Sequence, residues 1–373
     1  MIIAVNTRLL IPGKIEGIGR FALETLRIIT RDHPEHQFVF MFDRKYSDEV
    51  VFSSNVIPVR VFPPARHPLL WIAFFEYGIP PVIRKFKADL FLSPDGWLSL
   101  RTGVLSLPVI HDLNFLHFPQ FIPFQFRQYY NYYFPRFAAK ACRIATVSEF
   151  TRNDLSDKFG VDAGKIDVVY NGATGFTPAN EQIIKEIRNK YTGGDPYFVF
   201  VGLIHPRKNL AGLFLAYDRF RQECNSNVRL LVVGARKWWT GEMQQAYENS
   251  TYRSDIIFTG RLPDDEVRKI TASALGMVYI SWFEGFGIPV LEAMNCDVPV
   301  ICSSTSSLPE VGGNAVLYAD PGNVESVKSA MIRLYKDSGL RNSLIEKARV
   351  RREKFSWEKT AQSLWTSVEK CAK

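Results

Sequence analysis

Short apolar runs alternate with amphipathic stretches in the first half of the chain. The runs occupy residues 2–5, 37–42, 56–62, 89–93, 105–110, 144–147 and 166–170. Patterns with a broad apolar face at helical spacing lie between some of them, as at residues 69–86. Strands that alternate with helices are typical of a mainly parallel sheet, so this half predicts an α/β unit.

The same alternation restarts after a boundary at residues 173–195, which are rich in Gly, Pro, Asn and Thr. Further apolar runs occupy residues 197–201, 229–233, 256–259, 277–282 and 298–302, and helical patterns occupy 323–337, 339–354 and 357–371. We therefore predict α/β domains at residues 1–175 and 193–354, followed by a C-terminal helix within 355–373.

Composition adds little to the fold prediction but narrows the class of protein to an ordinary globular one. The chain has 373 residues, of which 46% are hydrophobic and 23% charged, as is ordinary for a globular protein of two domains. No uncharged apolar run is long enough for a transmembrane helix, and Met1-Ile2-Ile3 lacks the basic start of a signal peptide, so a cytoplasmic protein is expected. The five cysteines form no Cys-x-x-Cys pair and are interpreted as reduced thiols rather than disulfides or a zinc site.

The net charge is +8 and is shared evenly between the two halves. Residues 1–180 carry 20 Lys and Arg against 16 Asp and Glu, which leaves 26 against 22 and a charge of +4 in each part. Nucleic-acid binding would require a clustered basic stripe or a known module, and neither is found, so no nucleic-acid partner is expected. Anionic substrates near an anionic membrane surface fit this charge better.

Residues 284–294 carry the most informative chemistry. They follow the apolar run at 277–282, and Pro289 suits the first turn of a helix. A glycine loop that leads into a helix start gathers unpaired N–H groups and favours an anion. Glu284 and Glu292 bracket this site, and carboxylates fit beside a phosphate if they bind hydroxyl groups, so a sugar nucleotide is indicated. The alternative is a Gly-Phe-Gly turn in which Glu292 interacts with its own helix dipole.

Two cations, Arg207 and Lys208, come directly before Asn209, which is a strong helix N-cap. Cations at a helix N-terminus oppose its dipole, so they make sense if an anion is shared between them and the helix. A solvated surface pair is the alternative. No Asp-x-Asp motif occurs in the chain, so we expect no metal ion and assign neutralisation of a diphosphate to these two cations.

Candidate ligand groups also occur in the first half. His111 and Asp112 follow the strand at 105–110, on the side where parallel sheets bind ligands, and Asp112 is placed to orient the imidazole. A structural histidine is the alternative. Gly17 and Gly19 are expected in a loop before a helix, where they would let the backbone approach a ligand, although these residues alone favour a plain loop.

The segment from Asp112 to Glu149 contains no acidic residue between these ends, but many aromatic residues and four cations: Arg127, Arg136, Lys140 and Arg143. Aromatic and basic residues on one helix can dock at a membrane interface, which predicts a peripheral contact with the inner membrane surface. The alternative is a core helix kinked by Pro135.

Taken in order, these motifs resemble family 4 of the retaining glycosyltransferases, which has the GT-B fold. The resemblance spans nearly the whole chain and rests on Glu284-x7-Glu292, Val201-Gly202 with Arg207-Lys208-Asn209, His111-Asp112, Val147-Ser148-Glu149, Asn171-Gly172 and Leu308-Pro309-Glu310-Val311. Gly17-Ile18-Gly19-Arg20 and the aromatic stretch after His111 are similar to bacterial mannosyltransferases that build O-antigen or capsule.

The resemblance implies two Rossmann-like domains that face each other across a cleft, with the final helix crossing back to the first. It assigns catalytic roles to Arg207 and Lys208 at the leaving diphosphate, to His111 at the transferred sugar and to Glu284 at the sugar hydroxyls. Further donor contacts are implied for Gly17, Gly19, Asp112, Thr259, Arg261, Leu262, Gly285, Phe286, Gly287, Val290, Leu291 and Glu292. Among these, the Val290 and Leu291 amides would meet the diphosphate, Glu292 the ribose, and the 259–262 loop the base.

The activity implied is metal-independent transfer of a hexose, with retention, from a nucleotide sugar to a glycan or lipid-linked glycan acceptor. The expected donor is GDP-mannose and the expected transferred sugar is mannose. No cofactor is expected beyond this co-substrate. Three alternatives stay open: transfer from a UDP-sugar, a non-catalytic subunit that binds sugar nucleotides, and an epimerase that needs no acceptor.

Overall fold

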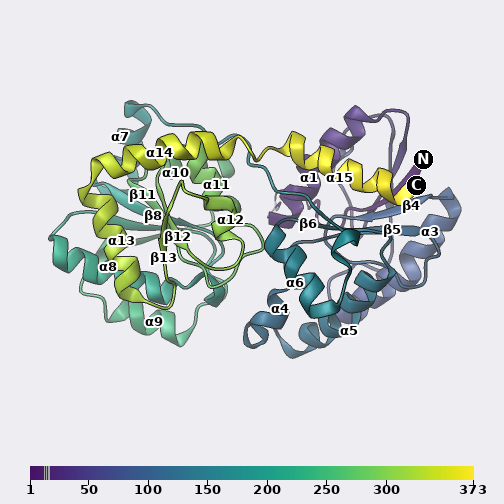
Figure 1. The fold of residues 1–373 in the computed structure, drawn as a ribbon, viewed down its shortest axis with the longest axis horizontal. Helices are drawn as coiled ribbons and strands as arrows, with labels where there is room; N and C mark the ends of the chain where they lie inside the picture. The colour runs from purple at the N-terminus through teal and green to yellow at the C-terminus, as the bar shows by residue number, and fades with distance from the viewer. Residues whose placement is uncertain (12, 14, 16) are drawn as a thin grey trace. The chain divides into compact units, whose positions relative to one another are not determined.

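The computed structural model describes residues 1–11, 13, 15 and 17–373. Contacts divide the chain into two units, one formed by Met1–Gly172 with Phe355–Lys373 and the other by Ala173–Lys354. Each unit holds one parallel sheet with helices packed around it (Figure 1). The α/β prediction is therefore confirmed for both halves of the chain.

In the described residues, the sheet of the first unit has seven strands in the order β3-β2-β1-β4-β5-β6-β7. They are β1 (Ile2–Asn6), β2 (Gln37–Phe42), β3 (Val56–Arg60), β4 (Leu90–Ser93), β5 (Leu105–Ile110), β6 (Ile144–Thr146) and β7 (Ile166–Val168). The helices are α1 (Gly17–Asp32), α2 (Pro68–Ile72), α3 (Ile79–Phe86), α4 (Asn114–His117), α5 (Phe124–Lys140), α6 (Glu149–Phe159) and α15 (Trp357–Ala372). Ile3 is the register partner of both Phe38 and Leu90, which places β1 between β2 and β4.

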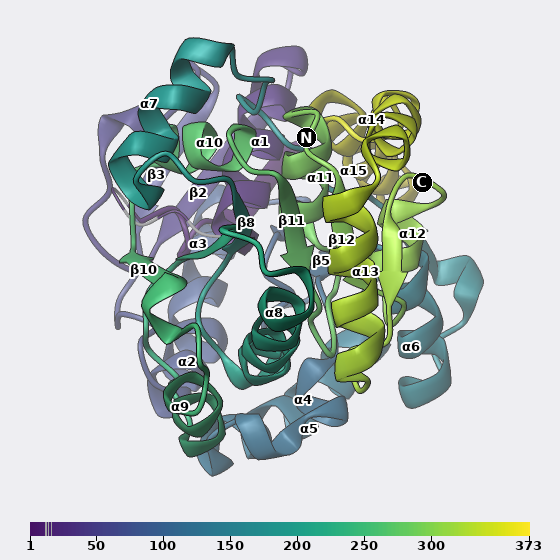
Figure 2. The ribbon, with the colours of Figure 1, turned by 90° about the vertical axis from the view of Figure 1, so that its left-hand side faces the viewer.

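In the second unit, the described strands form a six-stranded sheet in the order β10-β9-β8-β11-β12-β13. They are β8 (Tyr197–Val201), β9 (Arg229–Val233), β10 (Ile256–Gly260), β11 (Gly276–Tyr279), β12 (Val300–Ser303) and β13 (Leu317–Ala319). The helices are α7 (Glu181–Thr192), α8 (Leu210–Cys224), α9 (Gly241–Glu248), α10 (Asp264–Ala272), α11 (Ile288–Asn295), α12 (Leu308–Gly312), α13 (Val324–Lys336) and α14 (Ser338–Arg352). Helices α8 and α13 lie side by side (Figure 2) and are joined by an ion pair between Lys328 and Glu223 at 2.8 Å.

The strand orders locate where each unit can bind a ligand. In parallel α/β sheets, ligands bind beyond the carboxyl ends of the strands where the strand order reverses direction. This switch point lies between β1 and β4 in the first unit and between β8 and β11 in the second. The loops that follow these four strands are therefore the ones to search for a functional site.

Two sequence expectations in the first unit need correction. Gly17 and Gly19 do not lie in a loop, because α1 begins at Gly17 and includes both. A Cβ on Gly19 would lie 2.9 Å from the carbonyl oxygen of Leu9, so close packing of helix against loop explains this glycine. The helical pattern at 69–86 is one continuous region, but it contains a π-helical segment, Ala73–Gly78, between α2 and α3.

The aromatic segment forms helix α5. The residues that fit a core helix and the exposed aromatic residues lie on different faces of it. Tyr129, Phe134 and Phe137 are buried in the core of the first unit, as expected of a core helix with Pro135 inside it. Phe124 and Tyr132 are exposed. None of the helices in the described residues is both long and apolar enough to cross a bilayer.

The C-terminal helix α15 packs against α1 within the first unit (Figure 1). Its Thr360 hydroxyl donates to the Tyr170 carbonyl at 2.6 Å, and its Trp365 ring stacks on His33 with centroids 3.7 Å apart. Lys370 pairs with Asp167 at 2.8 Å. These contacts along the helix account for its place in the first unit although it follows the second in sequence.

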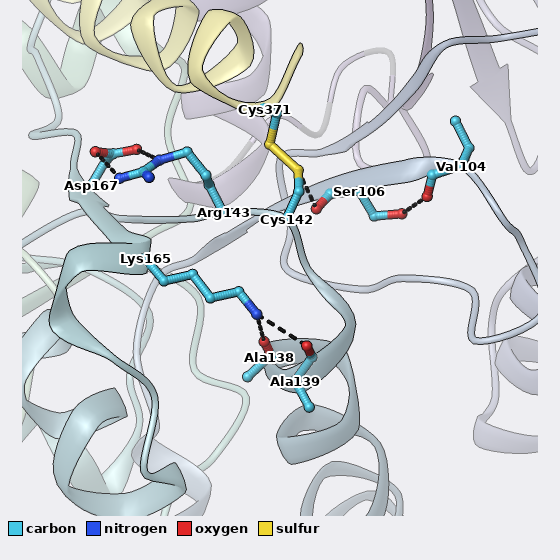
Figure 3. Close-up of a disulfide and its surroundings, with 9 residues drawn as sticks. All are labelled: Val104, Ser106, Ala138, Ala139, Cys142, Arg143, Lys165, Asp167 and Cys371. Carbon is cyan, nitrogen blue, oxygen red and sulfur yellow. Dashed lines mark hydrogen bonds and ion pairs between the residues drawn. A yellow bond between two sulfur atoms is a disulfide. The ribbon is translucent and has the colours of Figure 1, made fainter. Parts of the chain in front are cut away.

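The prediction that the cysteines form no disulfide is wrong. Cys142 and Cys371 are joined by a disulfide, which links the turn between α5 and β6 to the end of α15 (Figure 3). Their separation of 229 residues explains why spacing gave no sign of the pair. The other cysteines, Cys224, Cys296 and Cys302, are free thiols.

We expect Cys142→Ser to lower the free energy of unfolding by about 2–4 kcal/mol in oxidising buffer, because the disulfide restricts the unfolded chain. Urea unfolding with and without dithiothreitol measures this. Reductant should bring the wild type to the stability of the variant and leave the variant unchanged. Cys224→Ser, which removes a free thiol, is the control and should unfold like the wild type. A reductant-insensitive wild type would contradict the prediction.

Candidate active site

The two cations predicted at the leaving diphosphate and the carboxylate predicted at the sugar hydroxyls come together in the second unit. Lys208 Nζ lies 2.5 Å from Glu284 Oε1, and Arg207 Nη1 lies 3.0 Å from Glu284 Oε2. Lys208 also donates to the Tyr279 hydroxyl at 2.7 Å, and Arg207 to the Phe283 carbonyl. The cations follow β8 and the carboxylate follows β11, so this cluster sits at the switch point of the sheet.

The charge states of the cluster follow from its surroundings. Burial would raise the pKa of Glu284, but the charges of Arg207 and Lys208 outweigh it and lower the pKa to about 2. Burial, together with the same two cations, lowers the pKa of the neighbouring His205 to about 4. Burial raises the pKa of Tyr279 well above its usual value, and Glu284 adds to the effect. At neutral pH the cluster therefore contains two cations and one anion, with a neutral imidazole and phenol beside them.

Local turns hold the two cations in place. His205 caps the short 3₁₀ turn Pro206–Lys208, because its Nδ1 accepts from the Arg207 amide at 3.2 Å. Asn209 caps α8 as predicted, through a 3.3 Å bond from the Gly212 amide to its side chain. Its own side-chain amide donates to the Pro321 carbonyl at 2.8 Å. Lys208 is thereby fixed between two capped turns.

A second loop, after β12, holds the Glu284 segment. The Glu284 amide donates to the Ser306 hydroxyl, and the Ser307 hydroxyl donates to the Glu284 carbonyl, both at 2.9 Å. Thr305 donates to the Trp282 carbonyl at 3.2 Å. The sequence interpretation did not assign a role to these hydroxyls. Their cluster directly after an apolar strand next to the glutamate loop is the signal that could have found them.

The glycine loop leads into α11 as expected, with Pro289 in the first turn and Glu292 in the second. Gly285, Phe286, Gly287 and Leu291 are buried, and Glu292 is half-buried. The Val290 amide, predicted to meet a diphosphate, donates to the Gly287 carbonyl at 3.0 Å. A diphosphate would have to share this donor, so Arg207 and Lys208 are the better-supported anion ligands.

Gly287→Ala is expected to lower the free energy of unfolding by about 2–4 kcal/mol, from left-handed backbone strain and overpacking. Gly287 has φ +99°, and a Cβ there would lie 2.5 Å from Cδ2 of the buried Leu308. Urea unfolding measures the loss. Gly241→Ala is the matched control, since a Cβ at Gly241 meets nothing within 4 Å and should change stability little. Equal stability of the two variants would contradict this account of the loop.

The residues predicted to flank the base lie at the carboxyl end of β10. Thr259 is in the strand, and Arg261 and Leu262 follow it in a loop. Gly260 between them has φ +70°, which lets the chain turn out of the strand. Because β9 separates β10 from β8, this loop does not directly adjoin the cation pair.

The predicted residues of the first unit are differently arranged. His111 Nε2 donates to the Pro94 carbonyl at 2.7 Å, and burial lowers the pKa of the imidazole. Asp112 does not orient this ring as predicted, because its carboxylate accepts from the Asn114 amide at 3.0 Å. Phe21, in the α1 turn that follows Gly17 and Gly19, lies edge-on to His111 with ring centroids 5.1 Å apart. The start of α1 and the end of β5 are therefore neighbours.

A polar network at the switch point of the first unit was not predicted. Arg8 Nε lies 2.5 Å from Asp95, which also accepts from Asn6 at 2.7 Å and from Ser93 at 3.0 Å. The Arg8 guanidinium lies over the Trp97 ring, 3.9 Å from its centroid. Buried charges of this kind are costly unless paired. Polar residues directly after two apolar strands, β1 and β4, were the available signal.

No group of three or more His, Cys, Asp or Glu side chains in the described residues is arranged to hold a metal ion. The chemistry of the cluster is that of anion binding: an Arg fork and a Lys point charge beside a buried carboxylate. Two parallel α/β units, with such a site at the switch point of the second, match the GT-B fold that the sequence predicts.

Comparisons with known proteins identify the family. Residues 15–174 match the family described as Glycosyltransferase Family 4, and residues 182–351 match Glycosyl transferases group 1. O-antigen chain mannosyltransferase B of Escherichia coli is 30% identical over 357 residues, covering 92% of this chain and 93% of that protein. The chain belongs to glycosyltransferase family 4.

A further relative is similar in sequence, and a solved structure is similar in fold. O-antigen chain mannosyltransferase RfbU of Salmonella typhimurium is 26% identical over 286 residues, covering 76% of this chain and 75% of that protein. The crystal structure of Anabaena Alr3699/HepE in complex with UDP and glucose superposes with a TM-score of 0.73 at 16% identity, covering 98% of this chain and 99% of that one. At this identity the structural likeness supports the fold alone.

Proposed function

We propose that this glycosyltransferase moves mannose from GDP-mannose to a growing, lipid-linked surface polysaccharide, without a metal ion and with retention at the anomeric carbon. The observation that carries the proposal is the Arg207–Lys208–Glu284 cluster at the switch point of the second unit. The identity of the sugar rests on the similarity to O-antigen mannosyltransferases.

In the proposed reaction, the acceptor hydroxyl attacks the anomeric carbon from the face that the diphosphate leaves. The bond from the anomeric carbon to the phosphate oxygen breaks, a bond to the acceptor oxygen forms, and the leaving phosphate takes the acceptor proton. Negative charge grows on the leaving group, where Arg207 and Lys208 stabilise it. Glu284 lies beside the positive charge that develops on the sugar.

The donor can be tested directly by thermal unfolding with GDP, UDP and ADP sugars. A ligand at 100 times its dissociation constant adds about 2.7 kcal/mol of stability. We expect GDP-mannose to give the largest shift. A larger shift with a UDP-sugar would assign a different donor, and no shift with any of them would contradict the proposal.

Activity is tested by incubating the chain with GDP-mannose and lipid-linked glycan, and NMR of the product reports its anomeric configuration. Transfer should continue in excess EDTA. Strict dependence on a divalent ion would refute the metal-free reaction, an inverted product would refute retention, and donor binding without transfer would favour the non-catalytic subunit.

We further propose that the exposed face of α5 contacts the anionic inner membrane surface. The Arg127 guanidinium lies 5.5 Å from the centroid of the exposed Phe124 ring, and Arg136 lies 3.7 Å from that of Tyr132. Aromatic rings paired with arginines suit a lipid interface that bears negative charge. With no acidic residue between Asp112 and Glu149, nothing on this helix opposes that attraction.

Removing both arginines, as Arg127→Ala with Arg136→Ala, should weaken binding to anionic vesicles by about 30-fold, since each cation near the surface contributes about 1 kcal/mol. Vesicle co-sedimentation measures this. The control, Lys347→Ala with Lys354→Ala, removes the same charge from exposed positions of the second unit and should bind like the wild type. Equal loss in both double variants would show that net charge, not this face, drives binding.

A further inference from the structure

The loop that follows β9, residues 234–240, has no role in the site described so far. In the strand order β10-β9-β8-β11, β9 lies between β8, which carries Arg207 and Lys208 on its loop, and β10, which leads to Arg261 and Leu262. Its loop therefore lies between the proposed phosphate ligands and the loop predicted to flank the base.

Backbone hydrogen bonds tie this loop to the one that carries the cations. The Ile204 amide donates to the Ala235 carbonyl at 3.2 Å, and the Trp238 amide donates to the Ile204 carbonyl at 3.3 Å. A Cβ on Gly234 would collide with the carbonyl oxygen of Gly202, so the two loops leave their strands in close contact. The position of Trp238 relative to the cation loop is thus built into the backbone.

The two tryptophans in this loop have different surroundings. Trp239 donates to the Gln244 side chain at 2.5 Å, and its ring packs against Phe258 and is covered by the Arg236 guanidinium, 3.6 Å from its centroid. Trp238 is 44% exposed, and its main ring contact is edgewise with His205, at 5.6 Å between centroids. Trp239 therefore serves packing, whereas Trp238 keeps an exposed surface that a ligand can reach.

The chemistry of the loop fits a flat aromatic ligand that carries negative charge. Arg236 and Lys237 are exposed next to Trp238. The lowered pKa of His205 leaves it neutral at physiological pH, so the ring that separates Trp238 from the phosphate ligands adds no charge of its own. A nucleobase joined to a diphosphate has both features that the loop and the cation pair would recognise.

We propose that Trp238 stacks on the nucleobase of the donor, opposite the loop after β10. This inference rests on the proposed function, because it needs the diphosphate at Arg207 and Lys208. Stacking of a base on an aromatic side chain is sequence-tolerant and depends on shared ring area. Trp238 accordingly contributes more to the affinity for a purine nucleotide than to that for a pyrimidine nucleotide.

Calorimetric titration of Trp238→Ala with GDP, UDP and inorganic diphosphate tests this. We expect GDP to bind about 5- to 150-fold more weakly, the range measured when an aromatic ring under a base is removed. The loss for UDP should be smaller, and binding of inorganic diphosphate, which has no base, should be unchanged. Trp238→Phe should retain most of the affinity for GDP, and Trp239→Phe is the matched control for the loop.

The outcomes separate this inference from the function on which it rests. Wild-type affinity of Trp238→Ala for GDP would overturn the stacking role and leave the proposed function intact, provided that Arg207→Ala weakens both GDP and inorganic diphosphate. Equal weakening of GDP and inorganic diphosphate by Trp238→Ala would also overturn it, because the residue would then act through loop geometry. Failure of the wild type to bind any nucleoside diphosphate would overturn both.

Discussion

Lys208→Ala is expected to lower the rate of glycosyl transfer by about 100- to 1,000-fold, the loss typical when one preorganised donor to a developing anion is removed. Lys208 is buried, and its ammonium is held by Glu284 at 2.5 Å and by the Tyr279 hydroxyl at 2.7 Å. A charge fixed in this way needs no reorganisation when the diphosphate leaves, and that is the source of its effect. Steady-state kinetics with saturating donor measures the loss in kcat.

Two comparisons make this result specific. Arg207→Ala should give a loss of the same order, because its guanidinium shares the same carboxylate. Arg219, on α8, forms an exposed ion pair with Glu325 on α13. Arg219→Ala removes this cation and should keep nearly normal activity, because exposed pairs contribute little to stability. Near-normal transfer by Lys208→Ala, with unfolding like the wild type, would remove this residue from the proposed mechanism.

The sequence was sufficient for the parts of the site that depend on short-range patterns. The apolar run before Glu284, the proline in the first turn of α11 and the Asn209 cap each lie within a few residues of what they predict. Parallel strands then place their carboxyl ends on one edge of the sheet. Together these rules put Arg207, Lys208 and Glu284 on one edge of the sheet, although the carboxylate is 77 and 76 residues from the two cations in sequence. The strand order, which the sequence did not predict, makes β8 and β11 neighbours and so brings the three side chains together.

Contacts that depend on packing between distant segments could not be predicted in this way. Arg8 and Asp95 are 87 residues apart, and no pattern in either segment predicts that the two side chains pair. Asp112 was assigned to His111 because the two are adjacent in sequence, yet the His111 imidazole donates to the backbone carbonyl of Pro94. The histidine that does bond an aspartate is His117, and its partner is the distant Asp154. Adjacent residues on extended backbone point their side chains to opposite sides, so adjacency is a poor guide there.

Glu284 is the counter-charge for both cations. A diphosphate bound by Arg207 and Lys208 would take over this role and compete with the carboxylate for the same two side chains. The carboxylate would then be released toward the sugar, where its charge can stabilise the developing oxocarbenium. In the proposed reaction Glu284 would therefore oppose diphosphate binding while it supports transfer, and one substitution should separate the two effects.

Glu284→Gln is expected to lower transfer by about 100-fold while it tightens the binding of GDP by about tenfold, or about 1.4 kcal/mol. GDP lacks the sugar, so its affinity reports the cations alone, and they gain more from an anion once their carboxylate is gone. For GDP-mannose the gain should be offset by the lost sugar contact. Calorimetry and steady-state kinetics measure the two effects, and weaker binding of GDP by the variant would contradict the argument.

Glu284→Ala should share these effects and lose a further about 3–5 kcal/mol of stability, because it removes the acceptor that the two cations share, whereas glutamine keeps an acceptor oxygen there. The pH dependence gives an independent check. The pKa of Glu284 is lowered from 4.5 to about 2, so its stabilising charge is present above about pH 4.5 and is lost as the pH falls toward 2. The difference in unfolding free energy between the wild type and Glu284→Gln should therefore shrink from pH 5 to pH 2. A difference that stays constant over this range would show that the carboxylate charge is not what stabilises the cluster.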